Sequence, residues 1–172
     1  MAISLYDLSV RSFLQTLGSV AGFLDKSLAH FKANGMDPEE VVETRLHGDM
    51  LPFRFQIISV AHHSAGAIAG SKAGLVQMSP PNELDYAGLR KLIADARTAL
   101  EAVTPGEVNA LEGRDVIFQI GEHKMPFVVE DFLLSFSIPN FHFHATTAYD
   151  ILRQKGVPLG KRDYLGAIRL KA

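Results

Sequence analysis

Two histidines and an asparagine in the last third of the chain are the residues whose types and spacing could do chemistry. They lie in residues 140–144, Asn-Phe-His-Phe-His, within a segment whose apolar periodicity predicts a helix. At about 100° per residue, Asn140 and His144 share the shoulder of the apolar face, and His142 points to the opposite side, toward solvent or a hairpin. Two imidazoles four residues apart form a strong metal-ligand pair, but an amide oxygen is a weaker, neutral ligand. The spacing therefore predicts one inward histidine with an amide beside it.

Three interpretations of Asn140 and His144 are open from the residues alone. The two side chains can form a buried, hydrogen-bonded pair that fixes the helix, which is the usual state of buried polar groups. They can belong to a metal or substrate site, or they can be exposed and idle. The first interpretation is favoured.

A second polar pair lies on a segment without any charged side chain, residues 55–71. Gln56 and His63 are seven residues apart, so they fall on one line of a helix, whereas His62 points elsewhere. A helix without charge is surrounded by protein, so this segment is predicted to be the central helix of the fold. The two helices would then each present an imidazole and an amide at facing inner edges.

Glycines at a spacing of four, Gly66, Gly70 and Gly74, begin in this uncharged segment and continue just past its end. Glycine permits another backbone to come close. The favoured interpretation is the close approach of a neighbouring helix, and the alternative is a homodimer contact.

The composition indicates one domain spanning residues 1–172. Apolar residues make up 47%, charged residues make up 21%, and the net charge is −2, so nothing favours nucleic acid or a strongly charged partner. The chain has no cysteine, which excludes disulfides, zinc–thiolate sites and a cysteine nucleophile. No apolar run reaches the ~18 residues of a membrane span, and no signal-peptide pattern is found. We expect a cytoplasmic protein that binds neither nucleic acid nor membrane.

Four long helices and one hairpin are predicted from periodicity and capping signals. Ser4 begins the first helix in a capping box, Asn82 caps the third, and Pro52 and Pro139 lie in the first turns of the second and fourth. The expected helices are residues 4–34, 52–71, 82–103 and 139–155, and the hairpin strands at 116–120 and 125–129 lie between the third and fourth helices.

The remaining histidines give no further site. His30 is expected at a helix end, His47 in a loop beside Asp49, and His123 in the hairpin turn, where histidines are usually solvated. No nucleophile elbow, phosphate-binding loop or dinucleotide fingerprint occurs in the chain.

Three segments resemble one family. They are residues 139–153 (Pro-Asn-Phe-His-Phe-His-Ala-Thr-Thr-Ala-Tyr-Asp-Ile-Leu-Arg), residues 156–163 (Gly-Val-Pro-Leu-Gly-Lys-Arg-Asp), and residues 49–53 (Asp-Met-Leu-Pro-Phe) together with Gln56. They are similar to an uncharacterised, mostly bacterial and fungal domain-of-unknown-function family within the DinB-like superfamily, and the order of elements agrees over nearly the whole chain. The resemblance implies a mainly α-helical, up-down-down-up four-helix bundle, often assembled as a homodimer.

The resemblance also implies a metal site. In metal-binding DinB-like proteins, one histidine of the second helix joins a His–X₃–His pair on the fourth. Aligning the end of the fourth helix puts His144 on the second histidine of that pair and Asn140 on the first. Gln56 or His63 is the nearest match for the remaining ligand, and the sequence does not decide between them. These four residues are therefore the candidate ligands of a divalent metal, Zn²⁺ or Ni²⁺.

Two functions are consistent with these features. The first is a metal-dependent enzyme with its site between the second and fourth helices, where the metal would activate water or a thiol; some DinB-like relatives are thiol-dependent transferases or isomerases. The second is a non-catalytic small-molecule-binding or dimerisation module that has lost the metal. The sequence leaves open whether the chain is an enzyme.

Overall fold

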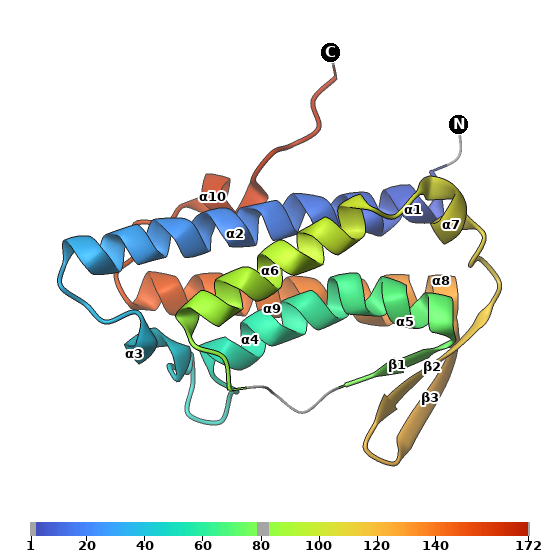
Figure 1. The fold of residues 1–172 in the computed structure, drawn as a ribbon, viewed down its shortest axis with the longest axis horizontal. Coiled ribbons are helices and arrows are strands. Elements are labelled where there is room, and N and C mark those ends of the chain that lie inside the picture. The colour runs from blue at the N-terminus through green and yellow to red at the C-terminus, as the bar shows by residue number, and fades with distance from the viewer. Residues whose placement is uncertain (1–2, 79–82, 172) are drawn as a thin grey trace.

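The four long helical segments predicted from the sequence form a bundle (Figure 1). The computed structural model describes residues 3–78 and 83–171. The first and fourth segments run in one direction and the second and third in the other, which is the up-down-down-up order. With η for π-helix, the elements are α1 (Leu5–Leu8), α2 (Val10–Ala33), α3 (Glu39–Val42), α4 (Phe53–Ala61), η1 (His62–Gly66), α5 (Ala67–Ala73), β1 (Leu75–Gln77), α6 (Tyr86–Glu101), α7 (Pro105–Asn109), β2 (Asp115–Ile120), β3 (His123–Val128), α8 (Val129–Asp131), η2 (Phe132–Ser137), α9 (Ile138–Gln154) and α10 (Lys161–Leu165).

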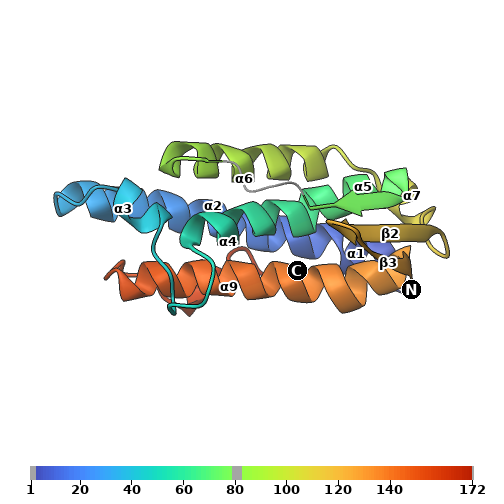
Figure 2. The ribbon, with the colours of Figure 1, turned by 90° about the horizontal axis from the view of Figure 1, so that it is seen from below.

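The helices α2 and α4 form the centre of the bundle (Figure 2). The helices α6 and α9 lie on opposite sides of them, and each contacts both central helices. Fully buried apolar side chains fill the interior; for example, the rings of Phe13 in α2 and Phe141 in α9 pack edge-on with centroids 4.9 Å apart. Burial of such apolar stripes is the main stabilising term for a bundle. Within residues 3–78 and 83–171, no helix is both long enough and apolar enough to cross a bilayer.

The first predicted helix is interrupted near its start. Ser4 caps α1 as predicted, because its hydroxyl accepts a hydrogen bond from the backbone N–H of Asp7 at 3.1 Å. Ser9 then separates α1 from α2. Its own hydroxyl donates to the Leu5 carbonyl at 2.6 Å, and its ψ reaches −76°. Bonding of a serine to the carbonyl four residues earlier bends helices, so the single helix predicted over residues 4–34 is two.

The second and fourth helices each change to a π-helix for a short stretch. The segment η1 joins α4 to α5, and η2 joins α8 to α9. The fourth helical segment therefore begins at Val129, well before Pro139. The predicted position of Pro139 in the first turn is confirmed, because α9 itself begins at Ile138. The extension before it, through η2 and α8, was not predicted.

The third helix begins later than predicted. The N-cap of α6 is Asp85, whose Oδ1 accepts a hydrogen bond from the N–H of Gly88 at 2.7 Å. The predicted cap, Asn82, lies outside the described residues. After α6, Thr104 and Glu107 form a reciprocal capping box that begins α7.

The predicted hairpin is present and belongs to a three-stranded sheet. The strands β2 and β3 pair antiparallel, with Ile120 opposite His123, and β1 pairs parallel with β2. The predicted elements leave residues 72–81 without regular structure, but Leu75–Gln77 form β1. A three-residue strand has too little alternation to be recognised in the sequence.

Gly70 of the second helix faces this added strand. A Cβ at Gly70 would lie 2.5 Å from Cγ2 of Val76 and 2.8 Å from the carbonyl oxygen of Leu75. The close approach predicted from the glycine spacing is therefore real at this position. The interpretation that a helix makes the approach is wrong, because the chain turns back on its own helix as β1.

Candidate functional site

His144 of α9 is held by Gln56 of α4. Nδ1 of His144 lies 2.7 Å from Oε1 of Gln56, and Nε2 of Gln56 donates to the Leu51 carbonyl at 2.7 Å. Because Leu51 takes the amide N–H, the amide oxygen faces the imidazole and can only accept. Neutral His144 must therefore carry its proton on Nδ1, which leaves a lone pair on Nε2. Among the residues that the structure describes, no hydrogen bond uses this Nε2.

His63 of η1 packs beside His144. Their ring centroids are 5.9 Å apart and their planes differ by 10°. The ring of Phe118 in β2 lies 6.3 Å from His63 at a similar tilt, so the hairpin contacts the same histidine. His63 is only 3% exposed, and within the described part of the chain its Nδ1 has no hydrogen-bond partner. A buried polar atom without a protein partner needs a water or a ligand.

The two π-helices meet at this point. Ser137, the last residue of η2, donates its hydroxyl to the backbone carbonyl of His63 at 3.0 Å. Both histidines of the second helix, His62 and His63, lie in η1, and their ring centroids are 5.0 Å apart. Short π-helical turns often occur at functional sites.

Burial keeps these imidazoles neutral. It lowers the pKa of His63 to about 3, with smaller contributions from repulsion by His62 and His144. It lowers the pKa of His144 to about 4, with a smaller contribution from repulsion by His62. The pKa of His62 is lowered by burial as well. At neutral pH the site therefore presents lone pairs and N–H groups, and not positive charge.

Asn140 and His142 do not join this group. Nδ2 of Asn140 donates to the Phe136 carbonyl at 2.8 Å, so the predicted hydrogen-bonded pair with His144 is not formed; the local backbone acceptor competes successfully for the amide. His142 points away from His144 as predicted. It is half-buried, and its Nδ1 lies 3.4 Å from the hydroxyl of Tyr164 in α10, not against solvent or the hairpin.

The candidate metal ligands come together only in part. Gln56 and His63 both lie beside His144, so the structure does not choose between them. Gln56 already uses both ends of its amide. Three imidazoles gather near η1, yet no group of three or more His, Cys, Asp or Glu in the described residues could hold a metal ion. Catalytic zinc normally has three protein ligands, so these donors fit such a centre poorly, and the metal site stays a prediction.

Comparison with known families and structures identifies the relatives of the chain. The profile of a family described as a domain of unknown function, DUF1993, matches residues 5–165. The chain belongs to this family. The crystal structure of a DinB family member protein from Shewanella denitrificans is similar, with 30% sequence identity and a TM-score of 0.81 over 98% of this chain and 95% of that chain. A comparison with curated proteins found no match. The predicted mainly α-helical, DinB-like fold is confirmed.

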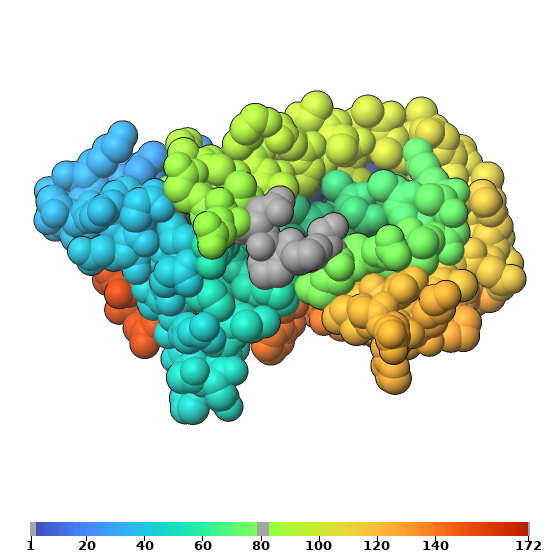
Figure 3. All heavy atoms as spheres, turned by 60° about the horizontal axis from the view of Figure 1, so that its bottom comes forward, coloured from blue at the N-terminus to red at the C-terminus, as the bar shows by residue number. Residues whose placement is uncertain are grey.

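One side of this DUF1993 chain is hollowed over α4 and α9, and these helices form the floor of the hollow (Figure 3). The segment before α4, residues 43–52, and the hairpin β2–β3 project from the same side of the bundle, with α4 and α9 between them. The contacts follow this floor: Leu51 of the first projection accepts from Gln56, and Phe118 of the second packs on His63. The group thus extends from the base of one projection to the base of the other.

Two aromatic side chains flank His144 at its outer side. The ring of Phe55 lies 5.7 Å from the imidazole and that of Phe143 lies 5.3 Å from it, both edge-on. Phe143 is 56% exposed, whereas His144 keeps an exposure of 9%. Apolar ring surface therefore reaches solvent directly beside His144.

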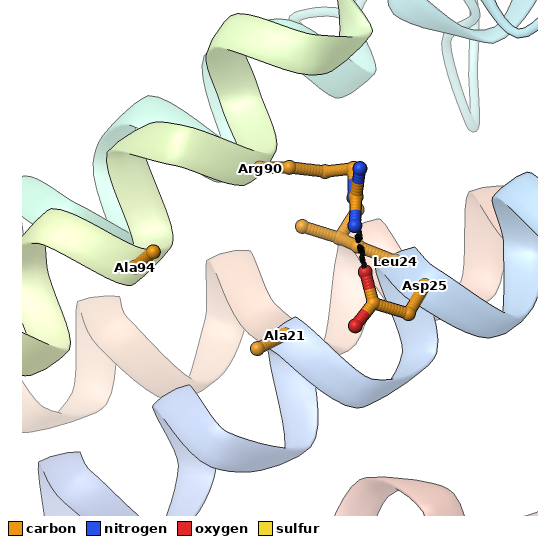
Figure 4. Close-up of a pocket in the computed structure, with 5 residues that line it drawn as sticks. All are labelled: Ala21, Leu24, Asp25, Arg90 and Ala94. Carbon is orange, nitrogen blue, oxygen red and sulfur yellow. Dashed lines mark hydrogen bonds and ion pairs between the residues drawn. The ribbon is translucent and has the colours of Figure 1, made fainter.

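A second hollow, between α2 and α6, lies away from the histidines (Figure 4). Its volume is about 130 Å³, and it is lined by Ala21, Leu24, Asp25, Arg90 and Ala94. Arg90 reaches across it to Asp25, with Nε 2.9 Å from Oδ1. Its two charged side chains are thus paired with each other, and we do not place the functional site there.

Sequence reasoning missed three parts of the site. The Leu51 carbonyl is a backbone group, so its role cannot be predicted from residue type. The only local signal is Pro52, because a residue before proline favours an extended backbone. The π-helical turns carry no recognised sequence signal. Phe118 was found as a strand residue, and only the fold brings it to His63.

Proposed function

We propose that this chain is a small-molecule-binding protein whose recognition group is Nε2 of His144, at the floor of the hollow between residues 43–52 and the hairpin. The observation that carries the proposal is the 2.7 Å hydrogen bond between His144 and Gln56. This bond fixes the orientation of the imidazole, and the free nitrogen, before a ligand arrives. Preorganisation of this kind reduces the entropy lost on binding.

The protonation of His144 supports binding over catalysis. A general base is most effective when its pKa is near the working pH. Burial lowers the pKa of His144 to about 4, so the imidazole is a weak base and a stable hydrogen-bond acceptor at neutral pH. The proposal therefore gives His144 a recognition role.

A metal-dependent enzyme is the second candidate. It is favoured by the adjacent rings of His144 and His63, each with one ring nitrogen that has no partner in the described residues. A divalent metal held there would activate water or a thiol. Two imidazoles are fewer protein ligands than catalytic zinc usually has, which is why we place this function second.

Nuclear magnetic resonance of the histidine ring nitrogens in ¹⁵N-labelled protein tests the proposal. Titration with indole should shift Nε2 of His144 saturably, while Nδ1 keeps its proton. The variant His144→Ala should lose this binding. The matched control His142→Ala, on the other side of α9 beside Tyr164, should keep it. Circular dichroism would confirm that both variants are folded.

Two results would overturn the proposal. Indole could bind His144→Ala as well as the wild type, or Zn²⁺ could saturate His144 and His63 at one equivalent while indole has no effect. The second result would establish the metal site in its place. The homodimer implied by the resemblance stays a separate prediction, which light scattering of the full chain can check.

A further inference from the structure

We infer that the ligand of the proposed site is an uncharged aromatic molecule that donates one hydrogen bond; this inference rests on the proposed function. Its first support is the charge pattern of the two helical segments that carry the site. Residues 55–71 and residues 132–149 contain no Asp, Glu, Lys or Arg. The polar groups that these segments offer are neutral imidazoles, amides and hydroxyls.

Charged groups next to these segments form ion pairs or are exposed to solvent. Arg54, at the start of α4, pairs with Glu43 at 2.9 Å. In the projecting loop, His47 and Asp49 pair with each other at 2.7 Å, and their side chains are 78% and 84% exposed. Beside His144, where neither segment carries a charge, a charged ligand would lose water without gaining a counter-charge. Unpaired buried charge is strongly disfavoured. The site therefore selects an uncharged molecule.

Aromatic rings pack around the histidines at both ends of the group. Phe55 and Phe143 present their edges or faces to His144, with interplanar angles of 73° and 83°. At the hairpin end, Phe118 and Phe136 pack with centroids 4.7 Å apart, and each also contacts His63. Edge-to-face and offset contacts with such rings favour a planar aromatic ligand over an aliphatic one of equal size.

The tautomer of His144 sets the polar group of the ligand. With the proton on Nδ1 and Gln56 as its acceptor, Nε2 can only accept. A ligand with an O–H or N–H satisfies this lone pair. A ligand without a donor would cover it and leave it unpaired, and a site built to hydrogen-bond a donor rejects analogues that lack one.

Four probes of similar size separate these requirements. Phenol is a neutral donor at pH 7.5, anisole has the same ring without the donor, and benzoate and benzylamine carry a negative and a positive charge. Each would be titrated into the full-length wild-type protein while the ring-nitrogen resonances of His144 are followed. Because all titrations use the unmodified chain, no variant has to fold.

The expected result is saturable binding of phenol with a dissociation constant of about 1 mM, as for other fragments of this size. Anisole should bind roughly tenfold more weakly, which corresponds to the loss of one hydrogen bond. Benzoate and benzylamine should leave His144 unchanged. If anisole, benzoate or benzylamine binds as tightly as phenol, the inferred ligand class is wrong and the proposed site stands. If none of the four perturbs His144, the proposed function itself fails, and the inference fails with it.

Discussion

The contact between α4 and α9 and the contact between α2 and α6 solve the same packing problem in different ways. At α2–α6, the side chains that cross the contact are apolar inside and charged outside, where Arg90 pairs with Asp25. Tyr86 is buried there, and its hydroxyl donates to the Leu24 carbonyl at 3.0 Å. At α4–α9, the polar side chains of Gln56 and His144 are inside, and residues 55–61 of α4 and 138–149 of α9 carry no charged side chain.

The α4–α9 contact is the part of this bundle that departs from what stability alone requires. Amphipathic helices with ion pairs at the rim are sufficient to hold four helices together. Burying His63 and His144 adds desolvation that a leucine at either position would avoid. Local features that oppose stability are expected mainly at functional sites. We therefore expect buried polar groups to destabilise the α4–α9 contact and not the α2–α6 contact.

The largest expected effect is a loss of stability in mild acid. The pKa of His63 is lowered to about 3 and that of His144 to about 4, while an unfolded histidine titrates near 6.5. The unfolded state therefore binds more protons below pH 6.5. The stability is complete above that pH, falls as the pH drops from about 6.5 to about 4 for His144 and about 3 for His63, and changes no further below those values. Between pH 7.5 and 5.5, each of the two should cost about 1.4 kcal/mol of unfolding free energy.

Urea unfolding at pH 7.5 and at pH 5.5 measures this loss. Most carboxylates titrate below this interval, so their contribution is small. The variant His63→Gln should retain only part of the pH dependence, because it removes one of the two imidazoles with a lowered pKa. If the unfolding free energy of the wild type is equal at the two pH values, the buried imidazoles do not destabilise the α4–α9 contact.

The second effect is expected from Gln56→Leu. The variant removes the acceptor of His144 Nδ1–H and leaves the donor buried without a partner, which should cost about 2 kcal/mol. The counterpart at α2–α6 is Tyr86→Phe, which removes an extra donor from a carbonyl inside α2 and leaves no donor unpaired, so it should cost about 1 kcal/mol. In Gln56→Leu the ring-nitrogen spectrum should also show His144 shifting toward the Nε2–H tautomer. Equal costs and an unchanged tautomer would remove the special role of Gln56.

The sequence predicts the regular half of this comparison well. Apolar periodicity locates the long helices, and Ser4 caps the first one as expected, because such signals depend on residues close together in the chain. The hairpin at β2–β3 is found for the same reason. What is missed is the helical extension before α9, through α8 and η2, because π-helical turns carry no recognised sequence signal.

The sequence predicts which residues lie near one another at the candidate site, but not which hydrogen bonds they form. His144, His63 and Gln56 are found because a helical projection puts them at inner edges, and the structure brings them together. Asn140 shares the same edge in projection, yet its amide turns to the carbonyl of Phe136. A projection gives the direction of a Cβ and not the rotamer beyond it, and nearby backbone acceptors decide the rest.

The third effect compares a glycine of α5, in the second helical segment, with a glycine of α2, in the first. Gly70→Ala would place a methyl group 2.8 Å from the Leu75 carbonyl oxygen, and the strain should exceed the gain in helix propensity, for a net loss of about 1 kcal/mol. Gly22→Ala in α2 is the matched control, because nothing lies within 4 Å of its added Cβ; it should stabilise the protein by about 0.5–1 kcal/mol. Thermal unfolding of both variants gives the sign directly. A stabilising Gly70→Ala would mean that β1 does not press on the second helix.

The smallest effect is expected where the structure shows the most visible interaction. Arg90 and Asp25 bridge α6 and α2 across the hollow in Figure 4, and both side chains are more than a third exposed. Solvent screens such a pair and ordering two side chains opposes it, so Asp25→Asn should cost less than about 1 kcal/mol, and less still in 1 M salt. Urea unfolding at low and high salt measures it. If Asp25→Asn cost more than Gln56→Leu, charge at the rim of α2–α6 would outweigh the buried amide at α4–α9, and the contrast between the two contacts would be reversed.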